Sequence, residues 1–140
     1  MPMQQGKIVR LSGDTVRAVL RSSSPEAVKE SAARGLILQL ADSAAPDAVA
    51  NAALLAMRDL GDKNLAIDLL HKATDAYLAR LAVLGGSHAY ATEEYEDEYD
   101  SISLKVAACR NFKSVVLSSK SPTDEANAIR AFESRIRMRE

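Results

Sequence analysis

Apolar residues recur every three or four positions along most of this chain, and nowhere more regularly than between residues 95 and 116. Alternating steps of four and three, with Lys113 filling one place, separate the members of this row: Tyr95, Tyr99, Ile102, Val106, Cys109 and Val116. Such spacing places all of them on one side of an α-helix. It predicts a single helix from about Thr92 to Ser119, with a heptad-like seam along which another helix packs.

The remaining sequence has the same period, and its prolines and glycines lie where helices begin or end. Helical patterns start at Asp14, at Pro25 with Ser24 as its N-cap, at Pro46, after Gly61-Asp62 and at Ser121-Pro122. Gly85-Gly86 ends the fourth pattern. In the second pattern the predicted buried stripe is Val28, Ala32, Leu36 and Leu40. In the third, many alanines would let a neighbouring backbone approach closely.

These patterns predict an all-α fold of about six helices, arranged as a bundle or as a short stack of helical hairpins. The one strand candidate is Lys7–Leu11, which is short and β-branched in its middle. We therefore expect residues 1–13 to form an arm or a short strand, and residues 14–140 to form one helical domain. A chain of 140 residues can bury an adequate core without disulfides or metals.

Composition excludes several classes of protein. The 18 basic and 19 acidic residues give a net charge of -1, which argues against a wholly basic nucleic-acid binder. The single cysteine, Cys109, cannot form an internal disulfide or a thiolate zinc site, and we expect it in the core. No signal-like segment or membrane-length apolar run is present, so the expected location is the cytoplasm, away from membranes.

The most conspicuous polar feature is a run with six carboxylates in eight residues: Glu93, Glu94, Tyr95, Glu96, Asp97, Glu98, Tyr99 and Asp100. One interpretation is an acidic, tyrosine-containing patch that docks a partner protein with a basic surface. The other is a solvated helix start, because acidic residues there complement the helix dipole. Both interpretations remain open from the sequence.

A basic counterpart lies at the other end of the chain, and it comprises Arg130, Arg135, Arg137 and Arg139. This basic tip would suit phosphate or an acidic partner, or it is a solvated helix end. The acidic run of one copy could also meet the basic tip of another, which makes a homo-oligomer one of the expected states.

Groups suited to catalysis are few. The chain has two histidines and one cysteine, and it lacks paired-cysteine spacing, a phosphate-binding glycine loop and the common hydrolase motifs. Asp68, His71 and Asp75 share a helical face, but this pattern is more typical of a surface histidine than of a metal site. We therefore expect no enzyme activity, no cofactor and no metal.

Residues 51–77 resemble part of a tetratricopeptide repeat. Gly61-Asp62 separates two helical patterns, and Ala66, Leu70 and Ala73 follow at the spacing of that family's large and small positions. The aromatic and Leu-Gly signature of its first helix is absent. This resemblance implies a protein-binding scaffold.

Residues 7–40 are similar to a ribbon-helix-helix DNA-binding domain, with a short strand followed by two helices. That resemblance implies a dimeric ribbon in the major groove, with nucleic-acid contacts from Lys7, Arg10, Ser12 and Arg17. The leading hypothesis is a non-enzymatic adaptor that binds protein through the acidic run or self-associates through the seam. A DNA-binding transcriptional regulator is the alternative.

Overall fold

The structure is a computed structural model that describes residues 14–136 except 23, 44 and 87–92; within helices, the side chains of residues 86 and 93–95 are not described. Residues 14–20 are helical. Five longer helices follow: α2 (Glu26–Ala41), α3 (Pro46–Arg58), α4 (Lys63–Gly86), α5 (Glu93–Ser118) and α6 (Pro122–Ile136). The described ranges contain no strand, which confirms the all-α prediction. The strand candidate at residues 7–11 lies outside them.

Helix boundaries follow local chemistry, as predicted. Pro46 occupies the first turn of α3, and Gly61 adopts a φ of 64° after its end, a conformation that glycine reaches without strain. Asp62 then caps α4, since its Oδ1 accepts the Leu65 amide at 3.0 Å. That bond, together with Arg34, lowers the pKa of the Asp62 carboxyl. The predicted cap of α2 is wrong, because Pro25 rather than Ser24 occupies the N-cap position and the helix has no side-chain cap.

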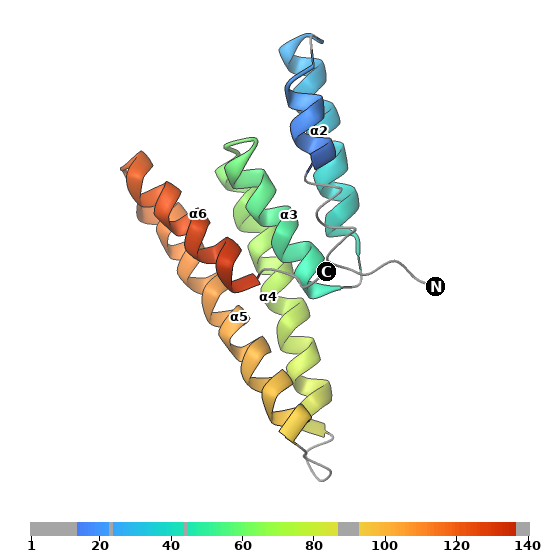
Figure 1. The fold of residues 1–140 in the computed structure, drawn as a ribbon, viewed down its shortest axis with the longest axis vertical. Coiled ribbons are helices and arrows are strands. Elements are labelled where there is room, and N and C mark those ends of the chain that lie inside the picture. Colours follow the sequence, from blue (N-terminus) through green and yellow to red (C-terminus); the bar gives the residue numbers. More distant parts are fainter. Residues whose placement is uncertain (1–13, 23, 44, 87–92, 137–140) are drawn as a thin grey trace.

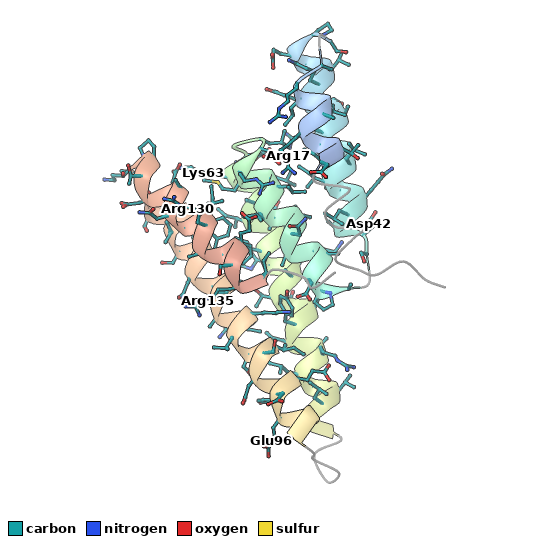
Figure 2. All side chains as sticks on the ribbon, in the orientation of Figure 1. Arg17, Asp42, Lys63, Glu96, Arg130 and Arg135 are labelled. Atoms are coloured by element: carbon teal, nitrogen blue, oxygen red, sulfur yellow. The ribbon has the colours of Figure 1, made fainter. Side chains whose placement is uncertain are left out.

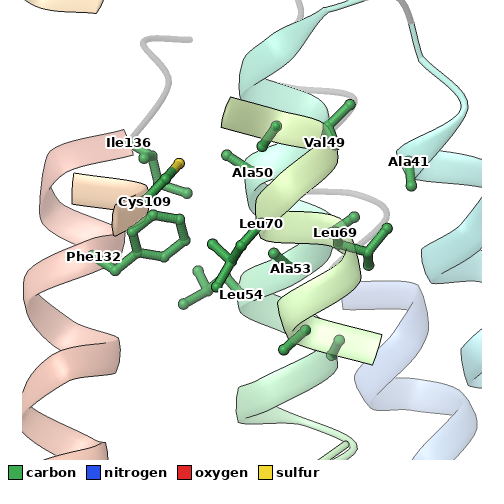
Figure 3. Close-up of a cluster of buried hydrophobic side chains, with 14 of the residues drawn as sticks. Ala41, Val49, Ala50, Ala53, Leu54, Leu69, Leu70, Cys109, Phe132 and Ile136 are labelled. Atoms are coloured by element: carbon green, nitrogen blue, oxygen red, sulfur yellow. The ribbon is translucent and has the colours of Figure 1, made fainter. Parts of the chain in front are cut away.

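Helix α3 forms the centre of the bundle. It packs against α2, α4 and α6, and every residue from Ala48 to Met57 except Asn51 is buried. Figure 1 shows α3 running alongside α4, with α2 on one side and α5 and α6 on the other. Figure 3 shows Ala50 and Ala53 of α3 beside Leu69 and Leu70 of α4. One contiguous cluster of buried side chains extends from Val16 to Ile136.

The predicted seam of α5 is a packing surface, but its partners are helices of the same chain. Ile102, Val106, Cys109 and Val116 are buried, while α5 packs on α4 and α6. Phe112 of α5 also stacks on Phe132 of α6, with ring centroids 4.5 Å apart. The idea of self-association through this seam is therefore corrected. Its described central part is already covered, so a second copy would need another face.

The predicted stripe of α2 is correct only toward its C-terminal end. Leu40 is buried and Leu36 is partly buried, but Val28 is 56% exposed and Ala32 is exposed. The other buried residues of α2 are Ala33, Ile37 and Ala41. Apolar residues surround most of α2, so several stripes are about equally apolar. The stripe that is buried is the one that the partner helices cover. Separately, no helix within the described ranges has the length and apolarity that crossing a bilayer requires.

The close packing around α3 predicts that Ala53→Leu destabilises the protein by about 1–3 kcal/mol, because Ala53 is completely buried and the larger isobutyl side chain must displace its neighbours. Chemical denaturation measures this change in the free energy of unfolding. The control is Ala82→Leu on the exposed side of α4, which should alter stability by less than about 0.5 kcal/mol. Equal effects of the two substitutions would contradict the central position of α3.

Candidate functional site

The acidic run lies on a part of the bundle that other helices leave uncovered. Helix α3 begins level with Tyr77 of α4, because the Tyr77 hydroxyl donates a hydrogen bond to Asp47 at the start of α3. Helix α6 ends about midway along α5, where Arg135 and Ala108 line the same groove. Beyond these points the last part of α4 and the first part of α5 project together, and we call this the hairpin end (Figure 1).

The helical twist divides the acidic run between two sides of α5. Glu96, Asp97 and Asp100 are exposed. Glu98 instead faces α4, where its Oε1 accepts hydrogen bonds from Nε and Nη2 of Arg80 at 3.0 and 2.7 Å. Tyr99 is 39% exposed at the edge of the seam. The side chains of Glu93, Glu94 and Tyr95 lie outside the described part of the chain.

The exposed carboxylates have an apolar neighbour. Leu104 is 58% exposed and lies one helical turn after Asp100, on the same side of α5. None of the ion pairs between described residues involves Glu96, Asp97 or Asp100. We refer to Glu96, Asp97, Asp100 and Leu104 as the acidic face.

The basic tip is only partly described. Arg130 is exposed, and its Nη2 donates to Asn127 Oδ1 at 2.6 Å on the same helix. Arg135 borders a groove of about 150 Å³ between α5 and α6, which is otherwise lined mainly by small and apolar residues: Ala108, Asn111, Phe112, Val115, Ala128, Ala131 and Phe132. Figure 2 shows both arginines on α6, well away from Glu96 at the hairpin end. Arg137 and Arg139 lie outside the described residues.

Of the four residues expected to contact nucleic acid, the structure places only Arg17. It pairs with Asp14 three residues earlier in the first helical segment. Lys7, Arg10 and Ser12 lie outside the described residues. The expected ribbon therefore stays a prediction.

A polar cluster that the sequence analysis missed joins three helices. Lys105 Nζ of α5 lies 3.0 and 3.1 Å from the two carboxylate oxygens of Asp47 in α3. Tyr77 of α4, which is 2% exposed, donates its hydroxyl to the same carboxylate. Burial, followed by the charge of Asp47, raises the pKa of the Tyr77 phenol, so the phenol keeps the proton that it donates. This cluster fixes the hairpin end to the start of α3.

The cluster also borders a pocket of about 270 Å³, whose wall includes Arg80, Glu98 and Ser101. Its four charged groups are paired with one another, Lys105 with Asp47 and Arg80 with Glu98. We interpret the pocket as part of the connection between helices, since its charges are already neutralised in pairs.

Cys109 is buried, as predicted. Burial raises the pKa of its thiol to about 11, an effect that a hydrogen bond with Thr74 partly opposes. Asp68, His71 and Asp75 are exposed on α4. Within the described ranges, no three His, Cys, Asp or Glu side chains converge as metal ligands do.

Comparison with known protein families, with curated proteins and with solved structures finds no match. The arguments about function therefore rest on the surfaces described above, and the two family resemblances remain expectations from the sequence.

The polar cluster predicts that Asp47→Ala destabilises the protein by about 1–3 kcal/mol, because it leaves a buried phenol hydroxyl and a largely buried ammonium without their acceptor. Urea denaturation measures the loss. Asp97→Ala removes a carboxylate near the start of α5 that has no such partners, so it should cost less than about 0.5 kcal/mol. Similar losses in the two variants would indicate that only the helix dipole matters.

The raised pKa of the Cys109 thiol predicts that the stability of the protein falls at alkaline pH. The thiol pKa is raised from 9.0 to about 11 on folding, so the unfolded chain releases this proton first. The free energy of unfolding should therefore fall as pH rises from about 9 to 11. In Cys109→Ala that decline should be smaller by on the order of 1–2 kcal/mol. Parallel pH profiles for the two proteins would contradict the assignment.

Proposed function

We propose that this protein is a non-enzymatic binding protein that holds a basic helical segment of a partner protein on the acidic face of α5. The exposed position of Leu104, one turn from Asp100, carries the proposal. Three carboxylates alone would suit a solvated helix start. Leu104 adds one apolar contact to these charges, which is the combination that an amphipathic partner helix uses.

The charges of the acidic face support the same function. Glu98 forms an ion pair with Arg80 of the same chain, whereas Glu96, Asp97 and Asp100 are exposed. A partner helix with lysines or arginines on one side of an aliphatic residue would match these carboxylates and Leu104 together. Such attraction increases the association rate and weakens with salt.

The support of the hairpin end suits a binding surface. The cluster of Asp47, Tyr77 and Lys105 holds α5 to α3 and α4 just beyond the acidic face. A surface on a rigid helix loses little conformational entropy when a partner binds. We also place the protein in the cytoplasm, where its single thiol stays reduced.

Binding of a fluorescent amphipathic peptide of lysine and leucine, measured by anisotropy at about 50 mM salt, tests the proposal. The triple variant Glu96→Lys, Asp97→Lys and Asp100→Lys should bind at least about tenfold more weakly, which corresponds to about 1.4 kcal/mol. Leu104→Ser should also weaken binding, because it removes the apolar contact.

The matched control carries the same change of charge on exposed acidic residues elsewhere, Glu30→Lys, Asp68→Lys and Asp75→Lys. It should keep affinity within about threefold, since distant charges are largely screened. An equal loss in both triple variants would mean that net charge alone attracts the peptide, and the acidic face would be rejected.

A further inference from the structure

A continuous row of side chains leads from the acidic face to the groove between α5 and α6. Positions 97, 101, 104, 108, 111 and 115 of α5 follow one another at steps of three or four, so they share one side of the helix. Ala108, Asn111 and Val115 line the groove, with Arg135 of α6 at its edge. The acidic face and Arg135 thus lie on the same side of α5, at different positions along the helix axis.

Leu104 lies between the two charged ends of this row. Asp100 is four residues before it, about 6 Å along the helix axis. Ala108 is four residues after it, and Arg135 borders the groove at the height of Ala108. Negative and positive side chains therefore lie in opposite directions from Leu104 along the helix axis.

We propose that a second copy of this chain covers this side of α5, in a dimer whose two-fold axis passes near Leu104. The two α5 helices then run antiparallel. Asp97 and Asp100 of each copy then lie close to Arg135 of the other copy. The inference rests on the proposed function, because it identifies the basic surface that the acidic face binds.

Three observations support a second copy as the occupant. The complementary charges occur on one chain and become reciprocal under a two-fold axis, as an isologous contact requires. Leu104 is 58% exposed and would meet its own counterpart on the axis. Ser101, its exposed neighbour in the row, is small and allows two helices to approach closely, while Ala108 is buried in the core.

This surface is separate from the buried seam of α5. Ile102, Val106 and Cys109 remain in the core of each copy, so dimerisation needs no unfolding of the bundle. Among described residues, no ion pair involves Asp97, Asp100 or Arg135, so their charges are available for a contact between copies.

A charge-swap experiment on the full chain tests the dimer by sedimentation velocity. The wild-type protein should sediment as a dimer at about 50 µM. The first variant is Asp97→Arg with Asp100→Arg, and the second is Arg135→Glu. Each alone should be a monomer, because like charges then meet across the axis at both ends. Mixed in equal amounts, they should form a heterodimer, since both ends again join opposite charges.

Cysteine crosslinking tests the position of the axis. Leu104→Cys should form a disulfide-linked dimer under mild oxidation, because a residue near a two-fold axis meets its own copy. The matched control is Leu117→Cys, which is equally exposed on another side of α5 and should crosslink at least tenfold more slowly. The buried Cys109 provides no competing exposed thiol.

A monomeric wild-type protein, a mixture that stays monomeric, or equal crosslinking at positions 104 and 117 would each overturn the inference. These results are distinguishable from failure of the proposed function. A monomer whose acidic face still binds the basic peptide would keep the proposed function and reject the dimer, whereas a monomer that lacks selective peptide binding would reject the proposed function itself.

Discussion

The close approach of helices around α3 is the constraint on which the rest of the structure depends. Alanines on nearly every side of α3 let α2, α4 and α6 pack against it at once. Because α3 has 13 residues while α4 and α5 have 24 and 26, the longer helices must extend beyond it. The hairpin end, and the acidic face on it, follow from this mismatch in length.

The sequence predicted the features of the fold that have local causes. Pro46, Gly61 and Asp62 determine helix ends through their own backbone preferences and hydrogen bonds, so these boundaries needed no knowledge of the tertiary structure. The burial of α2 depended on its partners instead. Its apolar residues surround the helix, and only the position of the neighbouring helices buries Ile37 rather than Val28.

Only part of the candidate site could be predicted, because the rest depends on how the helices pack. The run of carboxylates was visible, but its division between Glu98 and the acidic face depends on which side of α5 meets α4. The cluster of Asp47, Tyr77 and Lys105 could not be predicted. Tyr77 and Lys105 are 30 and 58 residues from Asp47 in the sequence. Each of the three suits an ordinary helix position when it is considered alone.

Opposite charges on one side of α5 have a consequence that a single acidic patch would lack. A surface of one sign repels its own copy, and it can bind only a different molecule. Here Asp100 and Arg135 lie in opposite directions from Leu104 along the helix axis, so the antiparallel dimer that we propose would replace repulsion with two attractive contacts. The net charge of -1 adds little repulsion between whole molecules. In the dimer that we propose, the order of charges along α5 therefore matters more than the total charge of the chain.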